Sequence, residues 1–400
     1  MANKQLFRRC SVCGSSEGAV LFSPTFELSA GNPLPRTYDL VACESCGFCF
    51  ADTSANQKTY DSYYAEMSKY ADSSSSTGSG SSPCDAERLC GLAEQISDFA
   101  PDRTARVLDF GCANGGLLSA LQSKGYEQLC GIDPSGTCVD QAREFALGGA
   151  WTGTLSHLPE NIGRFDGIIL SHVMEHVCDL VSAMRKIRDH IKTDGWVYVE
   201  VPDAMRYTEH LVAPYQDINT EHINHFSRSS LENLLGQTGY STLEGGQKTI
   251  FSAVGMPYPA AYVFARQSFD RKPVGKDLLL RPALETYLNA SRYLLARIGK
   301  KLQEIVSTHP SLIVWGTGQL TLRLLAETCL KDAQIEAFVD SNPVNQGREL
   351  RGVRILSPKD LVPGRTPILI SSVINSRAIH ETIRNLNLGN PTVDFDDALA

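Results

Sequence analysis

The sequence predicts an α/β protein built around a mainly parallel sheet, with a small metal-binding module before it and a second α/β unit after it. Three observations predict this. Cysteines crowd the first 50 residues, short apolar runs alternate with helical patterns through the middle of the chain, and the alternation resumes after residue 310. A chain of 400 residues, 42% of them hydrophobic, is long enough for two or three domains.

Composition limits the class of partner. The net charge is −8, and no Lys/Arg cluster forms the basic face that nucleic-acid binders carry. Residues 1–14 lack the apolar core of a secretory signal, and no run reaches the roughly 18 apolar residues of a membrane helix. We therefore expect a cytoplasmic protein, a monomer or dimer, that acts on a small molecule and binds neither nucleic acid nor membrane.

The first 55 residues contain two Cys-x-x-Cys-Gly pairs. Cys10 and Cys13 form the first pair, and Cys43 and Cys46 form the second. Four thiolates at this spacing favour one tetrahedral Zn²⁺, and because they fill every coordination position the zinc would be structural. Cys49 is a competing ligand for Cys46, which we prefer. The alternative is four buried thiols without a metal.

The predicted domains follow from these patterns. We expect a zinc-binding module in 1–55, the main α/β domain in 56–270, a connecting helix in 271–308 and a second α/β domain in 309–400. A tyrosine-rich run is followed by a Ser/Gly tract at 71–83, which is typical of a flexible linker and equally of a mobile loop over an active site.

The main domain shows its elements in order. A helical pattern over 87–99 leads into a first strand, Arg106–Phe110, and the later strands alternate with helices, as βαβ units require. These later strands are predicted at Leu129–Ile132, Gly167–Leu170 and Trp196–Val199, with a closing hairpin of Thr249–Gly255 and Ala261–Ala265. Apolar residues at helical spacing predict a long helix within 276–308, and a strand at Ser311–Gly316 opens the second unit.

The first strand of the main domain runs into a glycine-rich turn. Gly111 and Gly115 allow the backbone to approach a ligand closely and to adopt conformations that other residues avoid. Asp109 lies in the strand itself, where it would repel the pyrophosphate of a dinucleotide. An acid there favours a ligand with an ammonium and a sulfonium.

Two later positions complete the pattern. Asp133, about 20 residues on, ends the second strand, where a carboxylate accepts hydrogen bonds from both ribose hydroxyls. Ser171 lies at the end of the fourth strand, on the rim of the same crevice.

These pieces, over about residues 85–265, resemble the class I S-adenosylmethionine (SAM) methyltransferases. The resemblance implies a Rossmann-like methyltransferase domain, a second Rossmann-like domain behind it, and SAM held by Asp109, Gly111, Gly115, Asp133 and Ser171. Two features depart from the family: Ala113 replaces a glycine, and the segment after the third strand lacks the acid that often binds the adenine amino group. Backbone groups or Ser156 would have to substitute. The alternatives are a NAD-type domain or a non-catalytic one.

The segment at 221–227 is the candidate acceptor site. Ser227 looks like a helix N-cap, so the residues before it lie on the approach to a helix, over the ligand edge of the sheet. His222 has the pKa range of a general base, with Glu221 to orient it, and His225 is the second candidate. The alternative is that these side chains only fix the loop, a role we also assign to Glu175 and His176.

A narrower resemblance joins the cysteine pairs, the tyrosine-rich run, the EHxxxFS segment and the C-terminal unit. Together they resemble the sugar C-methyltransferases that modify dTDP-linked 4-keto-6-deoxy sugars in antibiotic biosynthesis. The resemblance places Glu221, His222 and Tyr70 at the sugar, and it implies that 316–318 and 339–342 help to bind the nucleotide. The C-terminal segment lacks the tryptophan-containing run of the nearest relatives, which leaves the substrate open.

The implied reaction is methylation of a carbon beside a ketone through an enolate. O-methylation of a sugar or another small-molecule hydroxyl is the first rival. A scaffold protein with a retained cofactor site is the second, and a C-terminal NAD-binding oxidoreductase domain is the third. The sequence GTGQLTLRLL from Gly316 lacks the third fingerprint glycine, which argues against the last.

Overall fold

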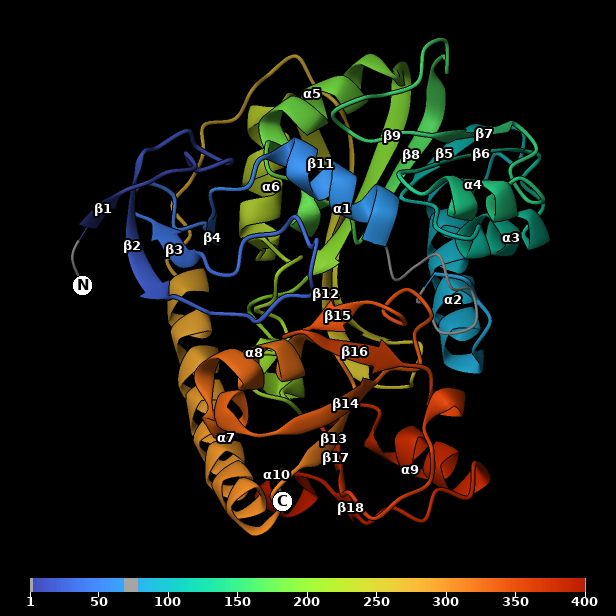
Figure 1. The fold of residues 1–400 in the computed structure, drawn as a ribbon. Coiled ribbons are helices and arrows are strands. Elements are labelled where there is room, and N and C mark those ends of the chain that lie inside the picture. The colour runs from blue at the N-terminus through green and yellow to red at the C-terminus, as the bar shows by residue number, and fades with distance from the viewer. Residues whose placement is uncertain (1–2, 68–77, 400) are drawn as a thin grey trace.

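The computed structural model describes residues 3–67 and 78–399, and these contain three sheets. Figure 1 shows the first four strands of the N-terminal sheet in blue, the central sheet mainly in green and yellow, and the C-terminal unit in orange and red. Tyr70 falls outside the described residues, so its predicted place at the sugar stays a prediction. Among the described helices, none combines the length and the apolar character needed to span a bilayer.

The N-terminal sheet is antiparallel, in the order β1-β2-β3-β4-β10. Its first four strands are β1 (Asn3–Gln5), β2 (Glu17–Phe22), β3 (Asp39–Cys43) and β4 (Cys49–Asp52). The last, β10 (Asn224–His225), comes from the candidate acceptor segment, and it pairs Asn224 with Phe50 and His225 with Cys49. The sheet that carries the cysteines therefore extends beyond residues 1–55 and includes part of the candidate active site.

The central sheet runs in the order β11-β12-β9-β8-β5-β6-β7 among the described residues. The strands β5 to β9 are parallel, and β12 and β11 add an antiparallel edge. Their bounds are β5 (Arg106–Phe110), β6 (Gln128–Asp133), β7 (Gly149–Thr152), β8 (Phe165–Ser171), β9 (Ile191–Pro202), β11 (Tyr240–Phe251) and β12 (Pro257–Gln267).

Helices cover both faces of this sheet because successive strand residues point to opposite faces. In β5, Val107 packs with α2 (Pro83–Phe99) and α3 (Gly116–Ser123), and Leu108 packs on the other side with α5 (Leu180–Asp189) and α6 (Arg228–Gln237). The remaining helical elements of this part are α1 (Gln57–Met67), α4 (Gly136–Ala142), η2 (Met174–His176) and η3 (Tyr207–His210).

The predicted strands of the central domain all lie within observed strands, except at the closing hairpin. There β11 begins at Tyr240, nine residues before the predicted Thr249, and the turn occupies 252–256. The early half of β11 is polar and only partly buried, because it is the edge strand of the sheet. An edge strand lacks the apolar alternation from which strands are predicted.

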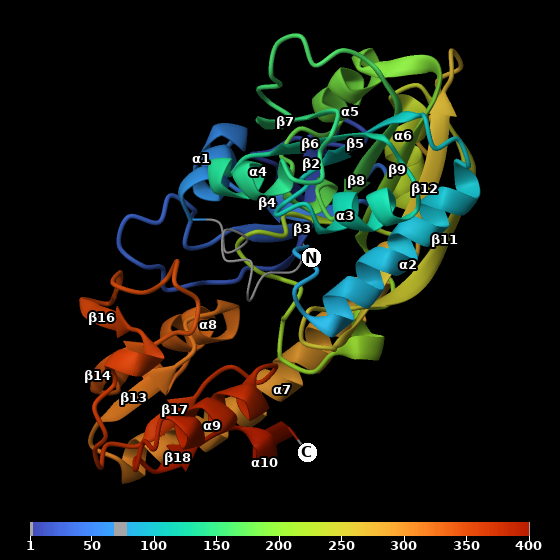
Figure 2. The ribbon, with the colours of Figure 1, turned by 90° about the vertical axis from the view of Figure 1, so that its right-hand side faces the viewer.

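The C-terminal unit follows the long helix α7 (Leu280–Thr308), and both ribbon views place it below the central domain (Figures 1 and 2). Its sheet order is β15-β16-β14-β13-β17-β18, with parallel pairing except between β15 and β16. The strands are β13 (Leu312–Trp315), β14 (Ile335–Val339), β15 (Glu349–Leu350), β16 (Val353–Leu356), β17 (Ile368–Ile370) and β18 (Thr392–Val393). The helices are α8 (Gln319–Glu327), η4 (Cys329–Asp332), η5 (Pro358–Asp360), α9 (Ser376–Asn385) and α10 (Asp396–Leu399).

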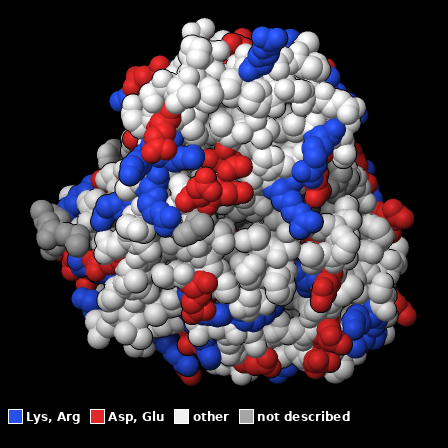
Figure 3. Space-filling model, turned by 90° about the horizontal axis from the view of Figure 1, so that it is seen from below, with Lys and Arg blue, Asp and Glu red and all other residues white. Residues whose placement is uncertain are grey.

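The face of the molecule seen from below carries charges of both signs. Lys and Arg side chains lie in small groups beside Asp and Glu side chains, separated by uncharged surface (Figure 3). Neither sign dominates this face.

Candidate active site

The loop after β5 has the backbone geometry that a closely held ligand needs. Gly111 and Gly115 have φ of +79° and +84°, in the left-handed region that favours glycine. A Cβ at Gly111 would lie 2.8 Å from Val173 Cγ2, so no side chain fits there without movement. Ala113, which replaces the expected glycine, also has a positive φ of +45°, and its N–H donates to Asp133 Oδ2 at 2.9 Å.

Asp109 and Asp133 are both buried beside this loop. Burial, with the charge of Asp133 adding to it, raises the pKa of Asp109 to about 7. Burial also raises the pKa of Asp133 to about 6, although the N–H groups of Ser135 and Ala113 oppose the rise. A cationic ligand would stabilise the ionised form of both buried acids. SAM fits this requirement, because its ammonium and sulfonium both carry positive charge.

These pKa values predict a pH-dependent affinity for the cofactor product S-adenosylhomocysteine (SAH), which keeps the ammonium. Below its raised pKa, Asp109 is neutral and cannot attract the ammonium. We expect SAH affinity to rise by at least about tenfold between pH 5.5 and 7.5, because it follows the ionised fraction of Asp109, whose pKa is about 7. Calorimetric titration across this range checks it. Asp109→Asn should bind SAH more weakly with a flatter pH dependence, and an unchanged profile in this variant would contradict the assignment.

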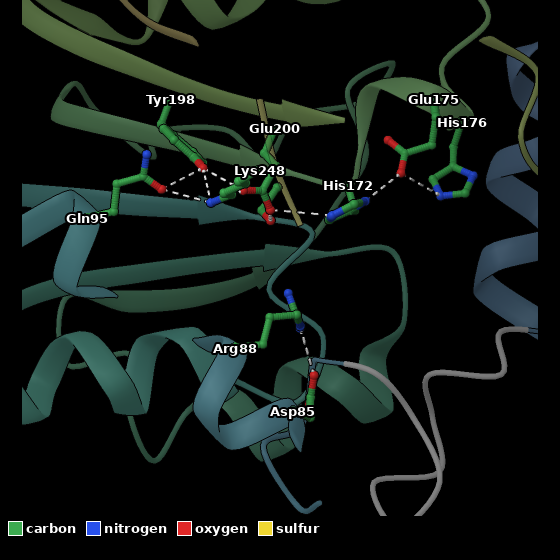
Figure 4. Close-up of polar contacts among 10 residues, drawn as sticks. Asp85, Arg88, Gln95, His172, Glu175, His176, Tyr198, Glu200 and Lys248 are labelled. Carbon is green, nitrogen blue, oxygen red and sulfur yellow. Dashed lines mark hydrogen bonds and ion pairs between the residues drawn. The ribbon is translucent and has the colours of Figure 1, made fainter. Parts of the chain in front are cut away.

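Arg88 is a charged residue of the cleft that the sequence analysis missed. It lies on α2, lines the cleft, and donates through Nε and Nη2 to Asp85 Oδ1 at 3.1 and 2.8 Å. Both side chains are nearly inaccessible to solvent. Figure 4 shows the Arg88 guanidinium across a gap from His172 and Glu200. A buried cation at this end of the cleft is suited to the carboxylate of the methionine moiety. One arginine within a helical pattern gave no signal in the sequence.

The structure brings His222 together with the pair Glu175-His176. The rings of His176 and His222 are 5.0 Å apart and nearly perpendicular, and His176 Nε2 lies 3.8 Å from Glu175 Oε1. His176 Nδ1 lies 3.0 Å from the Glu221 carbonyl oxygen. The Tyr64 hydroxyl lies 2.8 Å from the same nitrogen and 3.5 Å from Glu221 Oε2. Glu175 and His176, to which the sequence assigns a structural role, therefore lie within the cluster.

The N-terminal sheet holds the acceptor segment, residues 221–227, in place. The guanidinium of Arg8, which is half-buried, donates to Asn224 Oδ1 at 2.7 Å and to the Ile223 and Ala51 carbonyl oxygens at 3.3 Å. Asn224 Nδ2 in turn donates to the carbonyl oxygens of Met174 and Val177, both at 2.8 Å. Arg8 thus joins the cysteine-bearing sheet, the acceptor segment and the residues that follow η2.

A chain of buried charges continues from this cluster across the end of the sheet (Figure 4). His172 lies between Glu175 Oε1, 3.2 Å from its Nδ1, and Glu200 Oε1, 3.3 Å from its Nε2. Burial opposes a charged imidazole, but the two carboxylates raise the pKa of His172 to about 9. Glu200 also forms an ion pair with Lys248, which contacts Tyr198 and Gln95. The alternating signs compensate each buried charge.

The structure does not bring His225 to the cleft. His225 lies in β10, fully buried, with Tyr207 Oη 3.4 Å from its Nδ1, and it is absent from the described residues that line the cleft. Burial lowers its pKa to about 3, which keeps the ring neutral. Ser171 does line the cleft, and its hydroxyl donates to Glu200 Oε1 at 3.0 Å. Ser227 caps α6 as predicted, accepting from Ser230 N.

The cysteine pairs form one compact cluster. The Sγ atoms of Cys10 and Cys46 are 3.6 Å apart, those of Cys13 and Cys43 are 3.4 Å apart, and all four lie within 4.8 Å of one another. Tetrahedral zinc with Zn–S bonds of about 2.3 Å requires S···S separations of about 3.8 Å, so the four thiols fit the ion. Cys49 is not part of this cluster among the described residues, and its Sγ contacts the Gly47 carbonyl oxygen.

One cleft of about 1040 Å³ joins the described parts of the site. Asp109, Asp133 and Arg88 line one part of it, and Glu175, His176 and His222 line another. The loops after β13 and β14 line the end at the C-terminal unit. This volume exceeds that of a typical single-ligand pocket, so it has room for a cofactor and an acceptor together.

Comparison with known proteins identifies the class of the central domain. Residues 85–244 match the family described as a methyltransferase domain. With the glycine loop, the two acids and the sheet order, this shows that the chain contains a class I SAM-dependent methyltransferase domain with a Rossmann-like fold.

Individual relatives match over shorter lengths. The ubiquinone biosynthesis O-methyltransferase of Shewanella halifaxensis is 31% identical over 102 residues, which are 23% of this chain and 42% of the relative. The tRNA U34 carboxymethyltransferase of Campylobacter hominis is 27% identical, over 26% of this chain and 39% of the relative. The chain thus spans less than half the length of these relatives. A solved structure of coclaurine N-methyltransferase with N-methylheliamine and SAH has a TM-score of 0.39 and 13% identity, covering 50% of this chain and 80% of that chain.

Proposed function

We propose that the protein uses SAM to methylate a carbon beside the ketone of a nucleotide-linked keto-deoxy sugar. The observation that carries the proposal is the single cleft from the cofactor acids, past His222, to the loops of the C-terminal unit. A small acceptor would need only the part of the cleft beside the cofactor acids and the part beside His222. A nucleotide sugar is long enough to use all three.

Each charged side chain in the cofactor part of the cleft is proposed to contact a different part of SAM. Asp109 attracts the cationic methionine end, Arg88 pairs with its carboxylate, and Asp133 accepts from the ribose hydroxyls. Gly111 lines the cleft and leaves space for the backbone to contact SAM, whereas a Cβ at Gly115 would meet Ala142 and Phe145, so Gly115 serves the packing of the loop. When bound, SAM supplies an electrophilic methyl group that needs no further activation. The protein's contribution is therefore to generate and orient the nucleophile.

His222 is the proposed base. It accepts the acidic proton on the carbon beside the ketone, and the carbonyl oxygen gains the negative charge of the enolate. His176 contacts the ring of His222, and Tyr64 contacts His176, so a protonated His222 lies beside further polar groups. The Tyr64 hydroxyl lines the cleft beside His176 and is the proposed donor to the enolate oxygen. The family resemblance places another tyrosine, Tyr70, at the sugar.

The nucleotide is proposed to lie against the C-terminal unit. Gly318 lies beside the cleft at the N-cap of α8, and a Cβ there would meet nothing within 4 Å, which leaves room for a phosphate group at this helix N-terminus. Asp340 accepts from Thr317 N at 3.0 Å and from Asn342 N at 2.8 Å, so its main task is to hold the loop. The four N-terminal cysteines are proposed to hold a structural zinc ion.

O-methylation of a sugar or another small-molecule hydroxyl is the second candidate, and two observations favour it. The relatives include enzymes named O-methyltransferases. In addition, Glu175, His176 and His222 each offer a ligand atom within 4.8 Å of the others, a grouping that could hold a divalent cation beside a hydroxyl.

Deuterium exchange separates the two candidates. The protein would be incubated in D₂O with a dTDP-4-keto-6-deoxy sugar, with and without SAM, and the sugar analysed by mass spectrometry. We expect enzyme-dependent deuterium uptake without SAM and a carbon-bound methyl group with it. Methyl transfer without exchange would replace the proposal with O-methylation. If SAH binds but the sugar neither exchanges nor gains a methyl group, the sugar substrate is wrong.

A further inference from the structure

One face of α1 lies along the cleft. Gln57, Asp61 and Tyr64 follow at i, i+4 and i+7, the spacing that places side chains on one face of a helix, and all three line the cleft. Tyr64 contacts the acceptor cluster, as described above. Asp61 is directed to a different place, the loop after β7.

Asp61 is tied to that loop by its carboxylate. Its Oδ2 accepts from Thr154 Oγ1 at 3.1 Å and from the hydroxyl of Ser156, and its Oδ1 accepts from Gln57 Nε2 at 2.9 Å. The three loop and helix donors leave room on a carboxylate that has about four acceptor positions. Asp61 is only partly buried, so its remaining positions are accessible from the cleft.

The same loop is where the adenine of SAM would lie. In the parallel register Asp133 pairs with Thr152, and Gly153 N donates to the Asp133 carbonyl oxygen at 3.0 Å. A ribose held by the Asp133 carboxylate therefore directs its base over the end of β7. Leu155 and Pro134 line the cleft there and offer apolar contact to a flat ring. Yet the loop itself, GTLSHLP over 153–159, contains no acid.

We propose that Asp61 supplies this missing acid, so that its carboxylate accepts a hydrogen bond from the 6-amino group of adenine. The carboxylate that recognises adenine then comes from a helix more than 90 residues before the loop. Thr154 and Ser156 hold this carboxylate in place. This inference rests on the proposed use of SAM. It adds that adenine is selected by a carboxylate that belongs to α1.

The test compares two ligands that differ at one position. SAH carries the 6-amino donor, and S-inosylhomocysteine carries a 6-oxo acceptor, which a carboxylate repels. Calorimetric titration of the full chain should give at least about tenfold tighter binding of SAH. Asp61→Asn should weaken SAH by about tenfold and remove the preference, because an amide can donate to a 6-oxo group. Asp140→Asn, an exposed acid on α4, is the charge-matched control and should behave as the wild type.

Thr154→Val separates recognition from simple support of the loop. This variant removes the hydrogen bond from Thr154 to Asp61 but leaves the Asp61 carboxylate. The preference for SAH should therefore persist, with a smaller loss of affinity than in Asp61→Asn. If Thr154→Val and Asp61→Asn lose affinity equally while both keep the preference, Asp61 only supports the loop and the inference is wrong. If the wild type binds neither ligand, the proposed use of SAM itself fails.

Discussion

Replacing His222 by Asn is expected to lower the rate of methyl transfer by about 10²–10⁴, the usual contribution of a general base. Deuterium exchange into the sugar without SAM should fall by a similar factor. SAH affinity should stay within about twofold of the wild type, because the residues proposed to hold the cofactor are Asp109, Asp133 and Arg88, not His222. Asparagine is close to the imidazole in size, so the change removes the proton acceptor with little effect on packing.

The measurement is a rate assay and an exchange assay on the same preparations. His309→Asn is the matched control, because His309 lies at the end of α7 and is not among the described residues that line the cleft. If His222→Asn exchanges deuterium at the wild-type rate, another group removes the proton. Tyr64→Phe then helps to locate the base, because it would alter the cluster around His176 without removing His222.

Replacing Cys43 by Ser is expected to remove the metal and with it the acceptor site, while the cofactor site survives. Structural zinc sites contribute apparent free energies of about 10–16 kcal/mol, as large as the whole stability of a typical domain. Because β10 is a strand of the cysteine-bearing sheet, unfolding of that sheet releases Asn224 and the segment that carries His222. Methyl transfer should become undetectable, and SAH binding should stay within about tenfold.

Hydrogen exchange checks this directly, since β3, β4 and β10 should lose protection together while β5 and β6 keep it. Metal analysis of the purified wild type should give one zinc per chain, and a strong chelator should reproduce the variant. Cys90→Ser is the control, because Cys90 is an exposed free cysteine. A Cys43→Ser protein with wild-type protection in β10 would show that the cysteines do not support the acceptor segment.

Much of the fold follows from the sequence because it depends on local pattern. The strand at Arg106–Phe110 coincides with β5, and the strands predicted at Leu129–Ile132, Gly167–Leu170 and Trp196–Val199 lie within β6, β8 and β9. The long helix predicted within 276–308 is α7. The positive φ of Gly111 and Gly115 follows from the glycine-rich turn. The start of β11 did not follow, because an edge strand exposed to solvent carries no apolar alternation.

What the sequence by itself determined is the set of sites whose residues lie close together along the chain. The cofactor loop, the acid at the end of the next strand, the two cysteine pairs and the acceptor motif are all short patterns with a physical requirement behind them. Only the tertiary structure decided which distant residues join them. Arg88 lines the same cleft as the two acids, Arg8 and β10 bind the cysteine-bearing sheet to the acceptor segment, and α1 brings Asp61 and Tyr64 to different partners in the cleft. Contacts between residues far apart in sequence depend on how elements pack, and no local pattern records that packing.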